Sequence, residues 1–404
     1  MHVLLLNQYY APSEAATAQL LTDLGEQLVA AGHRVTVVCS RRSYPDPSLV
    51  YPASERIAGV TVRRVWTSGF GRGSKLGRMS DYLGFIAGAG WRLLLERDVD
   101  VVVSLTTPPF VASVGLAAAR LRGARSIAWV MDVYPELAFR LGVLGRRSPL
   151  GRLLSIVERG TLARSDLCIA LGETMAERVR ESGARKVAVV HNWADGEAIR
   201  PQPVAGNPLR EQWGWSDRFV VLYSGNLGLA HDFGTVLDAA DRLRDESRVL
   251  FAFVGEGPRR ADVEAEVRRR ALPNVEFRPH VARERLGDSL TAGELHLVTM
   301  REGIEGLVVP SKIYGILAAG RPTLFVGPAE GEMPDILAAA GCGERIAVGD
   351  AGGLAQAVRR YAGDPQRCAD QGRAAREAFD ARFDRRLALA AHRRWIEALA
   401  DDDG

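Results

Sequence analysis

The feature that most constrains the fold is an alternation of short apolar strands with amphipathic helices, which runs twice along the chain. In the first half, "VLLLN" (residues 3–7) precedes a segment in which four leucines recur at helical spacing and Gly32 occupies a C-terminal cap position. After a polar stretch rich in Pro and Gly at residues 191–208, the alternation restarts with "RFVVLYSGN". Val- and Ile-rich strands alternating with helices are typical of parallel sheets covered on both faces, so the pattern predicts two α/β domains, each with a doubly wound parallel sheet.

A length of 404 residues agrees with two domains. We predict an N-terminal Rossmann-like domain at 1–195, a C-terminal one at 196–370, and a helical segment at 371–404 that packs back on the first domain. The region from Pro365 onward reads as helix throughout.

Charge and composition exclude several function classes. The formal net charge of +3 does not indicate nucleic acid binding. The four cysteines have no Cys-x-x-Cys spacing and the histidines have no ligand spacing, so we expect a reducing cytoplasm, no metal site and no cofactor. No apolar run approaches the roughly 18 residues of a spanning helix, so any membrane role should be peripheral, at the inner face of the cell membrane.

One stretch, "VVPSKIYGILAAGRP" at 308–322, suggests a phosphate site. A helix that begins at Pro310, Ser311 and Lys312 would present free backbone N–H groups and the positive end of its dipole, and Lys312 adds a full charge. The alternative is an ordinary helix start with a solvated lysine. The small-residue helix and the Gly-Arg-Pro that ends it favour the phosphate site.

Two turns with glycines resemble each other. "YSGNLG" (223–228) and "FVGEGP" (253–258) each follow an apolar strand, and glycine lets the backbone approach a phosphate closely. Taken singly, both are also compatible with plain turns.

A carboxylate pair follows a strand in the first half, in "SIAWVMDVYPELAFRLG". Asp132 at the end of this strand could receive a proton from a substrate hydroxyl, with Glu136 beside it. Equally, Asp132 could cap a helix whose first turn contains Glu136. There is no Gly-x-Ser-x-Gly elbow and no Gly-x-x-x-x-Gly-Lys-Ser/Thr loop.

Together with "NQYYAPSEAATAQLLTDLGEQLVAAGHRVTVV", "SLTTPPF" and "HNWADGEAIRP", these motifs resemble the retaining glycosyltransferases of the GT-B fold, family 4 (group 1), over essentially the whole chain. The likeness is greatest to the bacterial subgroup of O-antigen, capsule and colanic-acid-type enzymes. The resemblance implies two Rossmann-like domains facing each other across a cleft, with a C-terminal helix crossing back. It also implies metal-independent transfer of a hexosyl or N-acetylhexosaminyl group from a nucleotide-sugar to a hydroxyl, with retention.

The resemblance assigns Asp132 and Lys312 to catalysis, with Asp132 also bordering the acceptor. His280 and Val281 would lie near the base, and Glu305 is a possible substitute for one of two family glutamates. The candidate donor-binding residues are Ala15, Ala16, Thr17, Gly225, Asn226, Glu256, His280, Val281, Glu305, Pro310, Ser311, Lys312 and Tyr314.

The chain departs from the family pattern at several of these positions. Gly315 stands where many members have the second glutamate, and Ala15-Ala16 replaces a Gly-Gly loop. The family's Arg and Lys at the diphosphate are replaced near Asn226 and His231, so Lys312 should bear more of the phosphate charge. How the ribose is held is open.

The acceptor and the membrane are linked to residues 63–97, where basic residues and aromatics precede an apolar stripe at helical spacing. Such a segment suits a membrane surface and a lipid diphosphate, and also fits a core helix with a solvated basic loop. The candidate acceptor-binding residues are Asp132, Glu136, Arg72, Lys75 and Arg78.

The expected function is therefore sugar transfer to a lipid-linked acceptor, such as a polyprenyl-diphosphate sugar, in surface polysaccharide biosynthesis. Three alternatives remain: a transferase for a soluble small molecule, a catalytically silent protein that binds a nucleotide or a partner, and a 2-epimerase. The sequence leaves the donor, the acceptor and the oligomeric state open.

Overall fold

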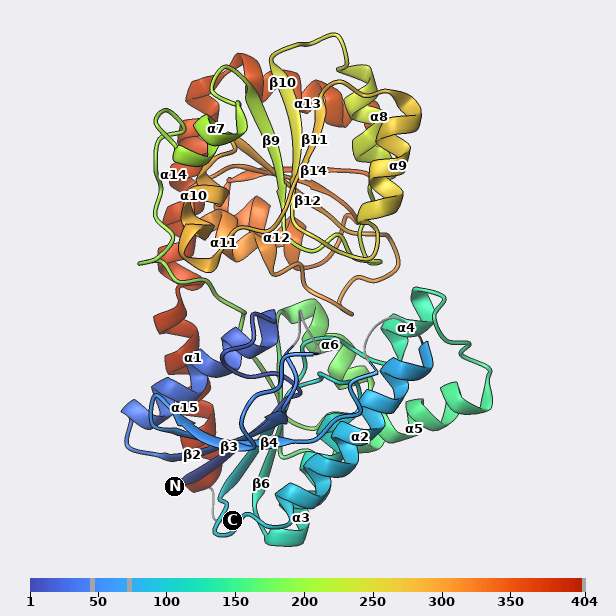
Figure 1. Cartoon of the computed structure of the whole chain (residues 1–404), viewed down its shortest axis with the longest axis vertical. Coiled ribbons are helices and arrows are strands. Elements are labelled where there is room, and N and C mark those ends of the chain that lie inside the picture. Colours follow the sequence, from blue (N-terminus) through green and yellow to red (C-terminus); the bar gives the residue numbers. More distant parts are fainter. Residues whose placement is uncertain (44–47, 71–74, 402–404) are drawn as a thin grey trace. The chain divides into compact units, whose positions relative to one another are not determined.

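The computed structural model describes residues 1–43, 48–70 and 75–401. The chain forms two compact units (Figure 1), which are treated separately below. The first comprises Met1–His191, Gly306–Val308 and Ala388–Gly404, and the second comprises Asn192–Glu305 and Val309–Leu387.

In the described part of the first unit, eight strands form one sheet. In order across the sheet they are β3 (Ser54–Ile57), β4 (Val60–Val65), β2 (Arg34–Ser40), β1 (His2–Leu6), β5 (Val101–Ser104), β6 (Arg125–Trp129), β7 (Leu167–Ala170) and β8 (Val187–Val189). Neighbouring strands are parallel except β3 and β4. The predicted parallel sheet is confirmed, with one antiparallel strand added at its edge.

Helices cover both faces of this sheet because the side chains of its buried strands alternate between the two faces. Leu4 and Leu6 of β1 share a core with Phe85 of α2 (Lys75–Leu93), whereas Leu5 lies next to Gly25 of α1 (Ala16–Ala30). The helices are α1 (Ala16–Ala30), α2 (Lys75–Leu93), α3 (Val111–Arg122), α4 (Glu136–Arg140), α5 (Pro149–Arg164), α6 (Glu173–Glu181) and α15 (Arg385–Asp401).

The second unit contains a six-stranded sheet in its described residues, and all neighbouring strands are parallel. In order they are β11 (Val275–Arg278), β10 (Val249–Val254), β9 (Phe219–Ser224), β12 (Leu295–Thr299), β13 (Thr323–Val326) and β14 (Gly343–Ile346). Chain order reverses between β9 and β12, which is the topological switch point of a doubly wound sheet.

Both faces of this second sheet are also buried. Val221 and Tyr223 belong to the core formed with α8 (Gly234–Arg242) and α13 (Ala351–Gly363), while Val220 and Leu222 pack with Trp215 on the other face. The helices are α7 (Pro208–Trp213), α8 (Gly234–Arg242), α9 (Arg260–Arg270), α10 (Leu286–Thr291), α11 (Lys312–Ala318), α12 (Glu332–Ala340), α13 (Ala351–Gly363) and α14 (Pro365–Arg382), with a 3-10 turn at η1 (Arg283–Arg285).

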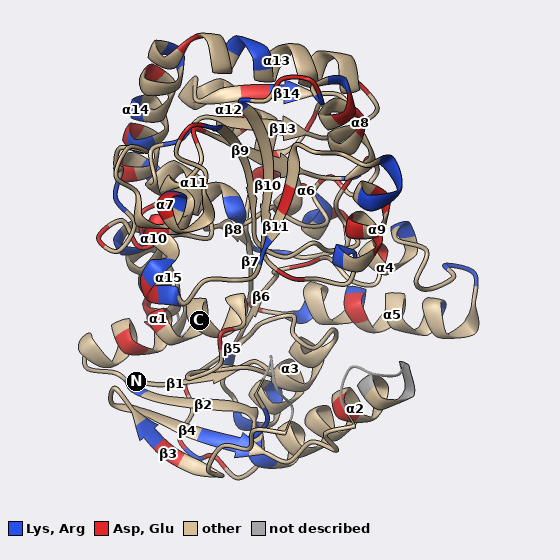
Figure 2. Ribbon diagram, turned by 45° about the horizontal axis from the view of Figure 1, so that its top comes forward, with Lys and Arg blue, Asp and Glu red and all other residues tan. Residues whose placement is uncertain are grey.

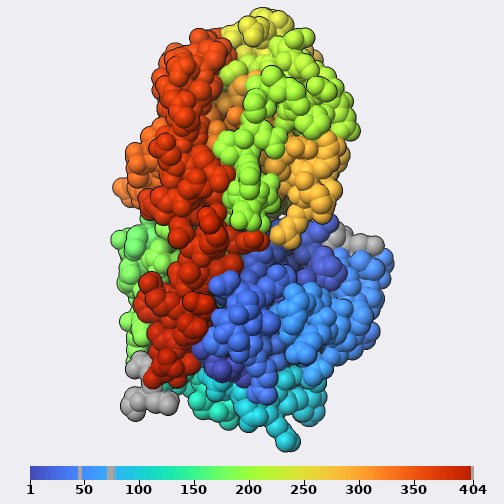
Figure 3. Space-filling view, turned by 90° about the vertical axis from the view of Figure 1, so that its left-hand side faces the viewer, coloured from blue at the N-terminus to red at the C-terminus, as the bar shows by residue number. Residues whose placement is uncertain are grey.

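The C-terminal region differs from the continuous helix that the sequence predicted. It breaks at Phe383 and Asp384, between α14 and α15. Phe383 is buried with its ring 5.4 Å from that of Tyr314, and Asp384 accepts a hydrogen bond from the backbone N–H of Arg386 at 2.9 Å. The buried ring and the side-chain cap end one helix and start the next. Figure 3 shows α14 beside the segment that precedes α7, consistent with hydrogen bonds from Arg376 to the carbonyls of Gly196 and Ile199.

Candidate functional site

The predicted donor site follows the two central strands of the second sheet. β9 ends at Ser224 and turns through Gly225 and Asn226, and β12 ends at Thr299. Ligands of doubly wound sheets bind beyond the carboxyl ends of the strands at such a reversal of strand order. Gly225 has φ +127°, and a Cβ there would lie 2.8 Å from Cε of Lys312. Glycine is needed at this position both for its backbone conformation and for the passage of the lysine side chain.

Lys312 lies against this turn, with its ammonium largely enclosed. Its Nζ is 5.1 Å from the centroid of the Tyr223 ring and 3.2 Å from Nε2 of His231. Burial lowers the pKa of Lys312 to about 8. Among the described residues the partners of this ammonium are His231 and the Tyr223 ring, and no carboxylate forms an ion pair with it. A buried cation without a counter-charge suits an anionic ligand such as a diphosphate.

The start of α11 contributes less than the sequence predicted. The helix has only seven residues, and Ser311 at its N-cap is exposed and makes no side-chain capping bond. Pro310, which precedes this N-cap, is buried. Because a helix of two turns has a weak dipole, the positive charge of this site comes chiefly from Lys312.

Tyr314 was predicted to bind the donor, and its position in the structure does not support that role. Its side chain is fully buried beside Phe383. A residue enclosed in this way supports the helix that carries Lys312 and does not reach a ligand in solution.

The turn at Gly255, which follows β10, packs against the turn at Gly225. Gly255 has φ +145°, and a Cβ there would lie 2.1 Å from the carbonyl oxygen of Gly225. The N–H of Leu227 donates to the carbonyl of Glu256 at 2.8 Å. The side chain of Glu256 is exposed and pairs with Arg260 at 2.5 Å, so it faces solvent rather than the Gly225 turn.

Three further donor candidates lie in loops of the second unit. His280 and Val281 follow β11, with His280 exposed. Glu305 accepts a hydrogen bond from the N–H of Gly303 at 2.8 Å, which fixes its carboxylate on its own loop. Among the described residues, none of these three forms a hydrogen bond or ion pair with Lys312.

The donor candidates of the first unit lie at the start of α1. Ala15 is the N-cap, Ala16 is exposed, and Thr17 accepts a hydrogen bond from the side-chain amide of Asn7 at 3.3 Å. This contact ties the start of α1 to the carboxyl end of β1, next to the switch between β1 and β5.

Asp132 follows β6 in the first unit, and its N–H donates to the hydroxyl of Thr106 at 3.2 Å. Its backbone also forms a bridge with Val308. Burial raises the pKa of Asp132 to about 6, still low enough for the carboxylate to be mostly ionised at pH 7. The capping alternative is wrong, because α4 has Pro135 at its N-cap and no side-chain capping bond.

Among the remaining acceptor candidates, Glu136 is the one whose side chain the structure describes. Glu136 pairs with Arg140 at 3.2 Å and with Arg146, so its carboxylate is neutralised at the surface. Lys75 and Arg78 lie in the first turn of α2, and their side chains are outside the described atoms. Arg72 lies outside the described residues.

Two contributors to the site, Tyr223 and Thr299, were not predicted, and His231 was noted only as a departure from the family pattern. A compositional signal was present: Lys and Arg total 52, of which only Lys75, Lys186 and Lys312 are lysines. In a chain that otherwise uses arginine, a lysine between buried elements stands out, because lysine shifts its pKa readily on burial whereas arginine does not.

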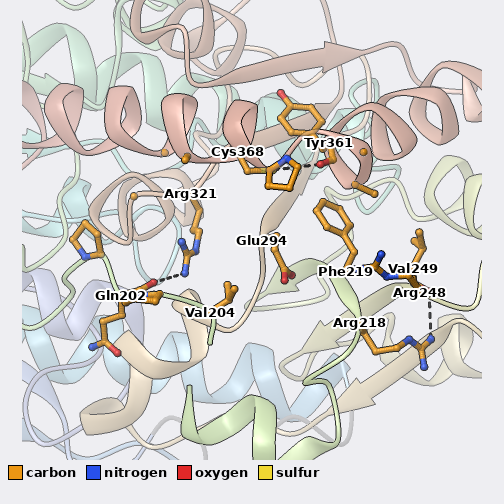
Figure 4. A pocket seen from close by; sticks show the side chains of 18 of the residues that line it. Gln202, Val204, Arg218, Phe219, Arg248, Val249, Glu294, Arg321, Tyr361 and Cys368 are labelled. Atoms are coloured by element: carbon orange, nitrogen blue, oxygen red, sulfur yellow. Dashed lines mark hydrogen bonds between the residues drawn. The ribbon is translucent and has the colours of Figure 1, made fainter. Parts of the chain in front are cut away.

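A large cavity of about 1110 Å³ lies elsewhere in the second unit, at the amino ends of β9 and β10 (Figure 4). Two of its charged groups, Arg321 and Glu294, already have structural partners. Arg321 donates to the carbonyls of Gln202 at 2.6 Å and Thr291 at 2.9 Å, and Glu294 accepts from Arg210 at 2.9 Å. These bonds fasten the segment before α7 to the sheet. The predicted donor site lies at the opposite end of the strands.

No group of three or more His, Cys, Asp or Glu side chains within the described ranges could hold a metal ion. Among the helices of the described residues, none is long and apolar enough to cross a membrane.

Comparison with known proteins agrees with this architecture. Residues 16–193 match the glycosyl transferase 4-like domain, and residues 218–364 match the glycosyl transferases group 1 domain. WcaI of Escherichia coli (strain K12), whose name assigns it provisionally to colanic acid biosynthesis as a glycosyl transferase, is 28% identical over 352 residues, which cover 82% of this chain and 85% of WcaI.

Two solved structures share the fold. Sucrose-phosphate synthase of Thermosynechococcus elongatus has a TM-score of 0.76 at 16% identity, covering 99% of both chains. HepE of Anabaena in complex with UDP-glucose has a TM-score of 0.74 at 17% identity, covering 98% of this chain and 100% of HepE. The two matched domains, in the order and sheet topology described above, show that the chain belongs to the group 1 glycosyltransferases and has the GT-B fold.

Proposed function

We propose that this glycosyltransferase moves a hexosyl or N-acetylhexosaminyl group from a nucleotide-sugar to a hydroxyl of a polyprenyl-diphosphate-linked acceptor, with retention and without a metal. The observation that carries the proposal is the buried ammonium of Lys312 beside the Gly225 turn, without a carboxylate partner. That HepE was solved with UDP-glucose supports a nucleotide-sugar as the donor class.

The chemistry required of the second unit is stabilisation of the leaving diphosphate. Negative charge develops on the phosphate oxygen as the sugar bond breaks, and a cation fixed nearby lowers the barrier. Lys312 supplies that charge, and the glycine turn leaves room for the phosphates. With the charge met by an ammonium and backbone N–H groups, the proposed reaction needs no divalent ion.

In the first unit we assign Asp132 to the acceptor. Burial raises the pKa of Asp132 to about 6, so at neutral pH its carboxylate is mostly ionised and can accept a hydrogen bond from the acceptor hydroxyl. Thr106 holds the backbone of Asp132 through its hydroxyl, which fixes the position of the carboxylate.

A lipid-linked acceptor is supported by exposed apolar side chains on the first unit. After β4, Trp66 and Phe70 are 63% and 74% exposed, and Trp91 of α2 is 68% exposed. These exposed aromatics support the membrane interpretation of the loop, whereas Phe85, Ala89 and Leu93 of α2 are buried in the core. Aromatic side chains with basic neighbours suit the interface of an anionic membrane.

A second exposed apolar segment contains α5 and the loop before it. Leu153 and Ile156 are 56% and 68% exposed, and Figure 2 shows basic residues in the loop between α4 and α5, which contains Arg146 and Arg147. We propose that both segments contact the membrane that carries the acceptor.

Incubation of the protein with UDP-, GDP- and dTDP-sugars and a polyprenyl-diphosphate sugar tests the proposal. We expect one donor to give product in which the new bond has the anomeric configuration of the donor, in the presence of EDTA. The double variant Trp66→Ser, Phe70→Ser should lose binding to phosphatidylglycerol vesicles and keep nucleotide binding. Donor binding without transfer to any acceptor would contradict the proposal and favour a catalytically silent protein.

A further inference from the structure

The side chain of His231 connects the two central strands of the second sheet to Lys312. Its Nδ1 lies 2.6 Å from the carbonyl oxygen of Thr299, and its Nε2 lies 3.2 Å from Nζ of Lys312. A carbonyl oxygen only accepts hydrogen bonds, so Nδ1 must carry a proton. In a neutral ring Nε2 then has no proton, and its lone pair can accept a hydrogen bond from the ammonium of Lys312.

Aromatic neighbours hold the imidazole in this orientation. The Tyr223 ring meets the imidazole edge to face, with centroids 5.8 Å apart and an interplanar angle of 84°. The Phe233 ring also packs on the imidazole, with centroids 6.0 Å apart and an interplanar angle of 49°. The same Tyr223 ring lies 5.1 Å from Nζ of Lys312, and its hydroxyl donates to the carbonyl of Asn226 at 2.8 Å. The ammonium of Lys312 is thus oriented by the Nε2 lone pair of His231 and by the face of the Tyr223 ring.

The protonation states around Lys312 are consistent with this arrangement. Within the described residues, His231 and Tyr223 are the titratable side chains against Lys312. Burial and the lysine charge lower the pKa of His231 to about 3, and burial raises the pKa of the Tyr223 hydroxyl. Both neighbours are therefore neutral at physiological pH, and Lys312 carries the charge.

We infer that His231 is a positioning residue whose neutral Nε2 accepts a hydrogen bond from Lys312, keeping the ammonium protonated and aimed at the donor diphosphate. This rests on the proposed function, because it assumes that Lys312 meets a diphosphate. One ammonium N–H is used by His231, which leaves the others for phosphate oxygens. Because the Nε2 lone pair already accepts the bond from Lys312, we assign the ring a positioning role and no proton transfer.

The test starts with the free protein, so that it does not depend on a ligand. Because the chain has three lysines, ¹³C-lysine labelling gives three side-chain signals, and Lys75→Arg and Lys186→Arg assign the third to Lys312. In His231→Leu the ammonium loses its acceptor, and we expect the midpoint of the Lys312 titration to fall by about one to two pH units. In His231→Gln the amide oxygen can accept the same bond, so most of the shift should be recovered.

The second readout is the affinity for the cognate nucleoside diphosphate between pH 6 and 10. Wild-type affinity should be constant at low pH and fall about tenfold per pH unit once Lys312 loses its proton. The start of this decline should move to lower pH in His231→Leu and remain near the wild-type position in His231→Gln. His33→Gln, which alters a histidine paired with Glu397 in the first unit, is the matched control and should move neither readout.

The outcomes separate the inference from the proposed function. An unchanged Lys312 titration in His231→Leu, or equal shifts in the Leu and Gln variants, overturns the positioning role. A loss of melting temperature in His231→Leu without a change in either pH readout would mean a purely structural histidine. If the wild-type protein binds no nucleoside diphosphate, the proposed function fails, and the titration of Lys312 still decides the contact with His231.

Discussion

Replacing Lys312 with methionine should make the empty protein more stable while removing its affinity for the donor. The ammonium is buried without a carboxylate, and burial lowers the pKa of Lys312 from 10.5 to about 8. At about 1.36 kcal/mol per pKa unit, a shift of this size corresponds to roughly 3 kcal/mol of unfavourable folding free energy at pH 7. Because Lys312 is partly accessible, we expect a gain of about 2 kcal/mol for Lys312→Met, whose side chain has similar length and no charge.

The pH dependence identifies the origin of this gain. Between pH 8 and 10.5 the unfolded chain binds the lysine proton while the folded chain does not, so wild-type stability rises with pH in this window. Lys312→Met lacks this term, and the difference between the two proteins should disappear near pH 10.5. Urea unfolding of both proteins at pH 7, 9 and 10.5 measures it. A Lys312→Met protein less stable than wild type at pH 7, or a difference that does not change with pH, would refute the reasoning.

Three further perturbations have defined outcomes. Gly225→Ala places a methyl group against Lys312 at φ +127°, so urea unfolding should show a loss of about 1–3 kcal/mol and calorimetry a weaker nucleotide affinity. Asp132→Asn should reduce kcat/KM by about a hundredfold or more. Because burial raises the pKa of the Asp132 carboxyl to about 6, wild-type kcat/KM should rise with pH near 6, and pH–rate profiles should show that the variant lacks this rise. Burial raises the pKa of Glu158 in α5 to about 8. Between about pH 4.5 and 8 the folded protein therefore keeps this proton while the unfolded chain loses it, so the stability of the wild-type protein falls as pH rises through this window. Glu158→Gln should therefore be more stable than wild type by roughly 2–4 kcal/mol at pH 8 and similar at pH 4.5, measured by urea unfolding at both values.

Much of the fold could be predicted because both faces of each sheet are buried. A strand such as Val249–Val254, buried at every residue, must be apolar throughout and is therefore visible in the sequence. Edge strand β3 escaped prediction because its sequence, SERI, is half exposed and polar. The turn after β3 has positive φ at Ala58 and Gly59, and Gly59 was the available sequence signal for a hairpin.

The site was only partly predictable, because sequence patterns locate backbone features better than side-chain partners. Gly225 and Lys312 were identified, since a turn after a strand and a helix start are local features. The contact of His231 with Thr299 joins residues 68 apart, and the sequence gives no sign of it. Glu256 was chosen for its place in a turn, but an arginine one helical turn later holds its carboxylate.

The central claim is that the second unit binds the diphosphate of a nucleotide-sugar through Lys312 and the Gly225 turn. Calorimetric titration with UDP, GDP, dTDP and ADP at pH 7 tests it most directly, with Lys312→Met and Lys186→Met compared in parallel. We expect one nucleotide to bind the wild-type protein and Lys186→Met equally, and to bind Lys312→Met at least tenfold more weakly. Equal affinity in Lys312→Met, or no binding of any nucleotide to the wild-type protein, would contradict the account.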